Sequence, residues 1–486
     1  MKRNKLYIII ISTVFLAFAV VFDTLPRSTY SKLENRDLAL FPKYSFESLK
    51  SGDFTNGISS WFSDTEPYRD VFMYMSMQVK DWLSLNVGKN NMKFHASNDK
   101  PQEEEVEIDK GDDGFNPNAN DIAKVATSGN LIVGEVPNVR ALMCYGGDER
   151  GGVDWANAVN QVKDSLGPGV KVYVMIVPIA TEFYLPENAQ KYSKPELPTI
   201  QNAHRHLKDV IPVDAHAALR AHTRENIYLR TDHHWSPLGA FYATREFARV
   251  AKVPFKELKD GYVQKVIHGY VGSMFHYTRD MSLKKSPEDF IYWEPTDTNY
   301  TVTTVDYRVN RNFQVISETA PHKSKFFFEF PNRPNASYEI FMGGDQFLVK
   351  VQTSLRSGRR LLIIKDSYGN VPPAYLFYSF DEIHVVDNRY FTKNLIQYVK
   401  ENRITDLVFI NNVYALYNPT SIKNYRRFLT QHDGDYKRRS ASGQSKSSKN
   451  KSDKKNNEKK QEKAREEAPK ASAGSEQGQA SSPAEP

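Results

Sequence analysis

Two short segments of the chain carry residue types that together can perform nucleophilic catalysis. The first is Thr231-Asp232-His233-His234-Trp235. If this segment is extended, residues two apart point to the same side, so Asp232 can reach Nδ1 of His234 while His233 points the other way. That contact would fix the tautomer of His234 and leave its Nε2 free to act as a base.

The second segment follows an apolar run at residues 361–364 and reads Lys365-Asp-Ser367-Tyr-Gly-Asn370. A Ser-x-Gly turn at the end of a strand presents the serine Oγ at the edge of the sheet. Backbone N–H groups at the start of a helix after it would stabilise an oxyanion. Such turns also occur without chemistry, but together with Asp-x-His this one predicts a Ser-His-Asp triad of Ser367, His234 and Asp232.

Other interpretations of these residues remain open. Asp232 can cap the helix after it, with both histidines merely packed. A metal site is the second alternative, because histidines gather between residues 204 and 234, but none has a zinc-binding spacing such as H-E-x-x-H. We therefore expect no metal and no cofactor. Cys144, the single cysteine, excludes an intramolecular disulfide and fits a buried structural thiol better than a nucleophile.

The elements that must position these residues alternate between strands and helices. Near-continuous apolar runs predict buried strands at 170–178, 360–364, 382–386 and 406–410, and a shorter strand at 227–230. Helices are predicted at 201–209 and from Ser236-Pro237 to about residue 250. This alternation predicts an α/β fold with a parallel sheet flanked by helices and a site beyond the carboxyl ends of its strands.

Changes in composition divide the chain into regions. A helical pattern at 54–87 is followed by an acidic, turn-rich stretch at 98–119. Residues 260–355 are rich in Tyr, Phe, Thr and Val, which predicts β-hairpins inserted between core elements. We expect an N-terminal helical part at 30–97, an acidic loop at 98–119, a catalytic domain at 120–433 with a β-rich insertion at 260–355, and a tail at 434–486.

The N-terminus predicts a membrane anchor. Residues 6–22 form an uncharged apolar run of 17 residues, and Lys2, Arg3 and Lys5 precede it. Positive charge before an apolar segment favours a cytoplasmic N-terminus, with the rest of the chain outside that membrane. A cleaved signal peptide and a buried core helix are the alternatives, but no A-x-A cleavage site follows.

The basic charge of the chain is concentrated in its tail. Residues 437–486 carry 13 Lys and Arg against 7 Asp and Glu, a net charge of +6, which leaves +1 of the total +7 for the other residues. The tail is also poor in large apolar side chains, so we predict that it is disordered. Because the folded part carries almost no net charge, a nucleic-acid partner is not expected.

The string Tyr228-Leu-Arg-Thr-Asp-His-His-Trp-Ser-Pro-Leu-Gly-Ala240 resembles the signature of the DHHW family of bacterial envelope proteins. That family is similar to the alginate O-acetylation proteins, which have SGNH-hydrolase-like domains. Further similarity lies in Glu34-Asn-Arg-Asp-Leu38, in Tyr68-Arg-Asp-Val-Phe72, and in the run at 174–186. The resemblance spans about residues 30–430, and it is poor at 90–150 and in the β-rich insertion.

The resemblance assigns roles to individual residues. It implies Ser367 as nucleophile, His234 as general base and Asp232 as its orienting partner, with the Asp-x-His segment before the serine, as in the alginate proteins. It also suggests substrate or oxyanion contacts in the loops after the next two strands and beside the serine: Arg389, Asn411, Asn412 and Tyr368. A glycine block of the SGNH kind is not evident in the sequence.

The resemblance also implies a function. We expect an extracytoplasmic O-acetyltransferase or acetylesterase that acts on an envelope or exported polysaccharide through an acyl-serine. A multi-span membrane acyltransferase would supply the acyl group. The anchored catalytic domain would face the periplasm or the cell exterior. An inactive glycan-binding or scaffold protein and a D-alanylation accessory protein acting on teichoic acid are the alternatives.

Overall fold

The computed structural model describes residues 10–17, 19–20, 24–31, 33, 36–83, 92–96, 129–309, 315–331 and 333–433. The predicted acidic loop at 98–119 and the predicted tail at 434–486 lie outside these residues. So does part of the predicted anchor at 6–22. Among the described residues, no helix is long and apolar enough to cross a membrane. The chain divides after Asp433 into two units, of which only the first contains described residues.

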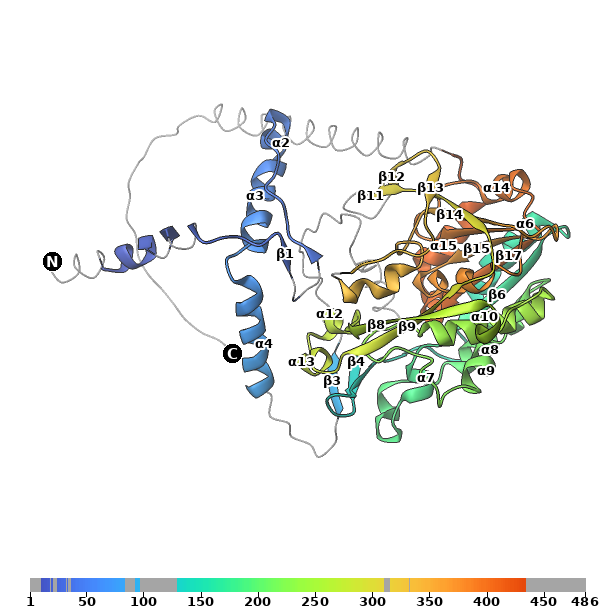
Figure 1. Ribbon diagram of the computed structural model, residues 1–486, viewed down its shortest axis with the longest axis horizontal. Helices are drawn as coiled ribbons and strands as arrows, with labels where there is room; N and C mark the ends of the chain where they lie inside the picture. Colours follow the sequence, from blue (N-terminus) through green and yellow to red (C-terminus); the bar gives the residue numbers. More distant parts are fainter. Residues whose placement is uncertain are drawn as a thin grey trace, which may run out of the picture. The chain divides into compact units, whose positions relative to one another are not determined.

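An eight-stranded mixed sheet forms the centre of the first unit (Figure 1). Five neighbouring strands are parallel, in the order β16-β15-β17-β6-β7. Three more, in the order β13-β10-β14, continue the sheet beyond β16 as antiparallel strands. The bounds are β6 Lys171–Val177, β7 Ile211–Val213, β10 Tyr300–Val305, β13 His322–Ser324, β14 Leu348–Thr353, β15 Arg360–Lys365, β16 Glu382–Asp387 and β17 Asp406–Asn412.

The parallel strands agree with the four apolar runs of the sequence. Leu361 to Ile364 of β15 have no exposed surface, because helices or loops cover both faces of a central parallel strand. The sheet as a whole is mixed, since β10, β13 and β14 belong to the β-rich insertion. In β14 the buried Val349 and Val351 alternate with more exposed neighbours, as expected for a strand packed on one face. The insertion therefore extends the core sheet as well as forming separate hairpins.

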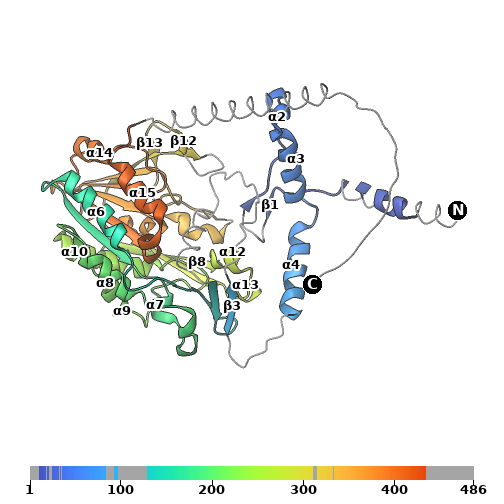
Figure 2. The ribbon, with the colours of Figure 1, turned by 180° about the vertical axis from the view of Figure 1, so that it is seen from behind.

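Helices cover both faces of the parallel strands. Tyr173 of β6 packs against Phe247 of α10 (Pro237–Ala251). Phe409 of β17 packs against Tyr425 of α15 (Pro419–Phe428) and lies in register with Val174, the neighbour of Tyr173. Because successive residues of a strand point to opposite faces, α10 and α15 cover opposite faces. Figure 2 shows α15 beside α6 (Val153–Leu166) on one of them.

The start of α10 is fixed by its sequence. The Oγ of Ser236 accepts a hydrogen bond from the Gly239 N–H at 3.1 Å, and Pro237 occupies the first turn. The segment just before it differs from the sequence prediction. Residues 227–230 form no strand, only an isolated bridge between Tyr228 and Trp235. A bend at residues 230–234 lies between the two bridge residues, so the chain folds back on itself there.

The other elements are smaller. One small sheet has three strands: β3 (Met92–Ala96), β4 (Gly129–Val133) and β5 (Arg140–Met143). Three further sheets have two strands each. They pair β1 (Tyr30–Ser31) with β2 (Arg36–Asp37), β8 (Tyr262–Tyr270) with β9 (Glu288–Pro295), and β11 (Tyr307–Val309) with β12 (Val315–Glu318). The remaining helices are α2 Phe46–Ser51, α3 Asp53–Asp64, α4 Arg69–Leu83, α7 Thr181–Tyr184, α8 Leu197–Arg205, α9 Ala215–Arg220, α11 Leu258–Gly261, α12 Met274–Thr278, α13 Met281–Lys284 and α14 Leu395–Glu401. Short 3₁₀ helices are η1 Glu187–Tyr192, η2 Pro334–Ile340, η3 Ser367–Asn370, η4 Pro372–Tyr375 and η5 Val413–Tyr417.

Candidate active site

Ser367 lies in a tight turn directly after β15. Asp366 caps the short helix η3, and its Oδ1 accepts a hydrogen bond from the Tyr368 N–H at 3.0 Å. Gly369 permits the turn to fold back on the strand, since a Cβ at this position would lie only 2.3 Å from the Cβ of Lys365. The Asp-Ser-x-Gly order thus sets the local shape that presents the serine at the carboxyl end of the strand.

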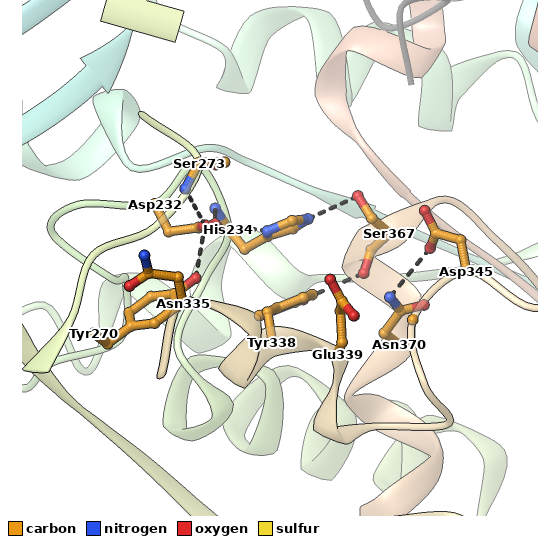
Figure 3. A pocket seen from close by; sticks show the side chains of 11 residues that line it. Asp232, His234, Tyr270, Ser273, Asn335, Tyr338, Glu339, Asp345, Ser367 and Asn370 are labelled. Atoms are coloured by element: carbon orange, nitrogen blue, oxygen red, sulfur yellow. Dashed lines mark hydrogen bonds and ion pairs between the residues drawn. The ribbon is translucent and has the colours of Figure 1, made fainter. Parts of the chain in front are cut away.

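Asp232, His234 and Ser367 form a continuous hydrogen-bonded series (Figure 3). The Nδ1 of His234 lies 2.7 Å from Oδ1 of Asp232, and its Nε2 lies 2.7 Å from Oγ of Ser367. An ionised carboxylate can only accept, so the Nδ1 carries the hydrogen and the Nε2 accepts the serine proton. This geometry can activate a serine hydroxyl as a nucleophile.

Asp232 is held by four donors. The backbone N–H and the Nδ1 of His234 contact its Oδ1, while the Ser273 N–H and the Tyr270 hydroxyl each lie 2.8 Å from its Oδ2. Burial alone would raise the pKa of Asp232. Interactions with His234 and His233 and the hydrogen bond from Ser273 outweigh burial and hold the pKa well below its usual range. The carboxylate is therefore ionised beside His234.

The Asp–His contact has a different origin from the extended segment that the sequence suggested. Residues 231–234 form a bend, in which the Asp232 carboxylate accepts from the backbone N–H two residues on, as in an Asx turn. His233 accordingly does not point away. Its ring centroid lies 3.7 Å from that of His234, and its Nδ1 lies 2.6 Å from the Ser273 Oγ.

A second ring fixes the plane of His234. Tyr338 of η2 stacks on it with centroids 3.9 Å apart and an interplanar angle of 9°, and the Tyr338 hydroxyl donates to the Ser367 carbonyl at 3.3 Å. The imidazole is thus held by Tyr338 and His233. An aromatic face also favours a cationic ring, so Tyr338 can stabilise an imidazolium when His234 takes a proton.

Hydrogen bonds between backbone and side chains lock the two segments together. The indole N–H of Trp235 donates to the Tyr368 carbonyl at 3.1 Å, and the Tyr368 hydroxyl donates to the His233 carbonyl. A side chain of each segment therefore donates a hydrogen bond to the backbone of the other, beside the His234–Ser367 contact. Trp235 and Tyr368 are fully buried, which makes both hydrogen bonds costly to leave unmade.

A pocket open to solvent lies beside Ser367, and the empty space at its mouth and between its walls, open solvent included, is about 430 Å³. Eleven residues line it, and most of them are labelled in Figure 3: Asp232, His234, Tyr270, Ser273, Asn335, Tyr338, Glu339, Gly344, Asp345, Ser367 and Asn370. Seven of the eleven belong to residues 260–355, the region that the sequence marked as an insertion. No local sequence motif predicts these seven residues. They line the pocket only because the tertiary fold brings β8 and η2 to the ends of the parallel strands.

The four contact residues suggested by sequence are bonded to other protein groups. Asn412 donates its N–H to Asp366 Oδ2 at 2.9 Å, and the Asn411 Oδ1 accepts from the Tyr425 hydroxyl at 2.6 Å. Tyr368 binds the His233 carbonyl, and Arg389 is ion-paired. None of the four is among the described residues that line the pocket.

Arg389 belongs to a buried ionic network that includes Asp345 of the pocket lining. It pairs with Asp345 and Asp387, and the Nζ of Lys365 lies 2.8 Å from Asp345 and 3.0 Å from Asp387. Burial alone would raise the pKa of Asp345, but Arg389 and Lys365 outweigh burial and hold that pKa well below its usual range. The Nδ2 of Asn370 donates to Asp345 at 3.1 Å, which links the network to the serine turn.

Asp366 has a different environment from the other carboxylates of the site. Burial raises its pKa to about 6, against the opposing effect of hydrogen bonds from the backbone of Asn412 and Tyr368. Asp366 therefore changes its protonation state near neutral pH, directly beside the nucleophile.

The only cluster of described residues with metal-ligand character is Asp232, His233 and His234, whose ligand atoms lie within 4.8 Å of one another. The Nδ1 of His234 is already bonded to Asp232, and the Nδ1 of His233 to Ser273. A metal would have to replace both hydrogen bonds. The donor set fits the hydrogen-bonded series better than a metal centre.

The fold and the site define an α/β protein with an Asp-His-Ser series at the carboxyl end of a mixed sheet. Comparison with known proteins gives the family: the sequence profile described as DHHW protein matches residues 144–386. A crystal structure of a DHHW family protein from Eubacterium siraeum is 39% identical, with a TM-score of 0.55 and coverage of 61% of this chain and 95% of that chain. The chain belongs to the DHHW family.

Two further solved structures are more distant. Bacillus cereus PatB1 is 20% identical with a TM-score of 0.48, covering 60% of this chain and 99% of that chain. The O-acetyltransferase domain of Pseudomonas putida AlgJ is 14% identical with a TM-score of 0.33, covering 61% of this chain and 98% of that chain. A comparison with curated protein sequences finds no match.

Proposed function

We propose that the protein is a serine acyltransferase or esterase that adds or removes acetyl groups on an envelope or exported polysaccharide. The observation that carries the proposal is the 2.7 Å contact between His234 Nε2 and Ser367 Oγ beside an open pocket. The proposal that the group is acetyl and that the substrate is a polysaccharide comes from the family resemblance of the sequence. The geometry supports the assignment of Ser367 as nucleophile and His234 as its base.

The first half of the reaction forms an acyl-enzyme. The Ser367 Oγ attacks the carbonyl carbon of an acetyl ester while its proton moves to His234 Nε2. Asp232 stabilises the resulting imidazolium through Nδ1. When the tetrahedral intermediate collapses, the bond to the leaving oxygen breaks, and that oxygen takes the proton from His234.

The second half returns the enzyme to its starting state. An acceptor hydroxyl attacks acetyl-Ser367 and gives its proton to His234, and the Ser367 Oγ leaves with that proton. A sugar hydroxyl as acceptor gives transfer, and water gives hydrolysis. Each step of the cycle uses Ser367, His234 and Asp232 together with the donor and acceptor.

The cellular setting is a separate part of the proposal. We infer from residues 6–22 that a single anchor holds the catalytic domain outside the cytoplasmic membrane, where a multi-span acyltransferase supplies the acetyl group. A reporter fused after residue 30 should be active only outside the cytoplasm, and the chain should fractionate with membranes. A soluble cytoplasmic pool would contradict this.

The test of the chemistry is covalent trapping. The full chain is treated with a fluorophosphonate or with p-nitrophenyl acetate, and the adduct is located by mass spectrometry. The adduct is expected on Ser367 and not on Ser273, the other serine of the pocket. Failure to label Ser367 would leave the glycan-binding alternative. Loss of D-alanyl rather than acetyl esters from the envelope of a deletion strain would favour the D-alanylation alternative.

A further inference from the structure

Exposed apolar side chains are concentrated in the N-terminal part of the chain. Among the residues that the structure describes, 24 large apolar or aromatic side chains are exposed, and 18 of these belong to residues 10–79. Residues 129–433, a much longer stretch, contain only five of the others. Soluble proteins rarely expose contiguous apolar surface, and such a surface usually marks contact with another protein or with a membrane. This distribution points to a contact surface in the N-terminal part.

One side of helix α4 is attached to the folded unit. Met73 and Met77 are partly buried and pack against a small core cluster to which β4, β5, α12 and α13 contribute. The carboxylate of Asp70 accepts hydrogen bonds from the Ser31 hydroxyl at 2.6 Å and from the Leu33 N–H at 3.0 Å. These contacts fix which side of α4 faces inward.

The opposite side of α4 is apolar and exposed. Phe72, Met75 and Val79 are three, four and seven residues apart, spacings that place side chains on one side of a helix. Met75 is two residues from both Met73 and Met77, which is about 200° of rotation around the helix. With Val71 at the edge of this side, the exposed fractions lie between 51% and 61%. We call these four side chains the α4 stripe: Val71, Phe72, Met75 and Val79.

The charge and the chain position of the α4 stripe favour lipid as its partner. The stripe has no charged side chain, and residues 40–80 carry four Lys and Arg against five Asp and Glu, so apolar burial must drive the contact. The stripe begins less than 50 residues after the apolar run at 6–22, whose described residues are also exposed: Ile10, Val14, Phe15, Leu16 and Val20. A tether of this length holds the stripe close to any membrane that the run enters, so even a weak contact with lipid forms.

We propose that the α4 stripe lies on the lipid surface of the membrane that holds the anchor, so that the enzyme touches this membrane at two points. The inference rests on the proposed cellular setting, in which residues 6–22 are that anchor. The apolar face of an interfacial helix enters the boundary between headgroups and acyl chains by about 5 to 10 Å. A second contact restricts how the catalytic unit turns above the membrane, which a single tether does not.

The test uses introduced cysteines, because Cys144, the single cysteine of the chain, is fully buried. The full chain with Phe72→Cys carries an NBD label, whose emission depends on polarity, and is reconstituted into phosphatidylcholine vesicles. Its emission should shift to the blue, and lipid with a nitroxide near the headgroup end of the acyl chain should quench it. Tyr74→Cys, exposed on the same helix but outside the stripe, is the matched control and should show a smaller shift and less quenching.

A label at Phe15→Cys reports on the anchor separately. Stronger quenching at Phe72→Cys than at Tyr74→Cys supports the inference. Quenching at Phe15→Cys with none at Phe72→Cys overturns it and leaves the anchor in place. If emission at Phe72→Cys shifts only as the protein concentration rises, without quenching by lipid, the stripe binds a second copy and the inference is wrong. No quenching at either site refutes the anchor as well.

Discussion

The bend at residues 230–234 and the region at 260–355 both contribute residues to the pocket, but by different physical means. The bend supplies reacting groups through contacts between near neighbours, such as the 2.9 Å hydrogen bond from the His234 N–H to Asp232. The region at 260–355 supplies supports over long chain separations, through Tyr270, Ser273 and Tyr338. Reactive groups can thus come from short motifs, whereas their orientation depends on the tertiary fold.

The largest expected effect concerns the reacting groups, Ser367 and His234. Ser367→Ala and His234→Ala should each lower kcat for p-nitrophenyl acetate by about 10³- to 10⁴-fold, and the double variant should lose little more, because the residues act as a unit. Circular dichroism checks the fold of each variant. Retention of more than a tenth of the wild-type rate in Ser367→Ala would remove the serine from the mechanism.

The next effect tests the ionic network that joins the region at 260–355 to β15 and β16. Lys365→Met leaves Asp345 and Asp387 with Arg389 alone, so the free energy of unfolding should fall by about 3 to 5 kcal/mol. Lys350→Met breaks a more exposed pair with Glu382 and should cost about 0 to 1 kcal/mol. Urea denaturation of both variants measures the difference, and equal costs would show that burial of the network is unimportant.

A smaller effect concerns Asp366 and pH. Its folded pKa of about 6 lies above the unfolded value near 4, so the native state holds a proton between these values that the unfolded state has lost. The free energy of unfolding should therefore fall as pH rises from 4 to 6, by an amount on the order of 2 kcal/mol. Asp366→Asn should lack this part of the slope in urea denaturation at several pH values. If the free energy of unfolding of Asp366→Asn and of the wild type changed with pH to the same extent, the raised pKa of Asp366 would be contradicted.

The smallest effect tests a support from the region at 260–355. Tyr270→Phe removes one of the four donors to Asp232, so kcat should fall about tenfold with little change in KM. The acid limb of the pH–rate profile should move to higher pH, because the Asp232 carboxylate has lost a hydrogen-bond donor that stabilised its anion. Tyr262→Phe, on the same strand but bonded to the Tyr375 carbonyl, is the matched control and should leave the profile unchanged.

Much of the fold follows from the sequence because its strongest signals are local. The apolar runs that become β6, β15, β16 and β17 are buried on both faces, and the cap at Ser236 fixes the start of α10. Strands β10, β13 and β14 were read as separate hairpins, since nothing in their alternating pattern says that β14 pairs with β16. Pairing between distant strands is decided by the tertiary fold.

The site divides in the same way. Asp232, His234 and Ser367 could be selected from residue types and spacing, although a bend rather than an extended segment brings the first two together. Tyr270, Tyr338 and Glu339 could not, because single tyrosines and glutamates in a β-rich stretch carry no spacing signal. Arg389 was expected at the substrate, but Asp345, which comes from that same stretch, holds it in an ion pair.

The hydrogen bonds that Trp235 and Tyr368 make across the two segments have a consequence for when the protein becomes reactive. The two segments are 133 residues apart, so during synthesis the Asp-His half exists well before its serine has been made. The contact between His234 and Ser367 forms only after a long loop has closed, a step that long-range contacts make slow. A chain that has not finished folding thus carries an unactivated serine, and its chemistry starts when folding is complete.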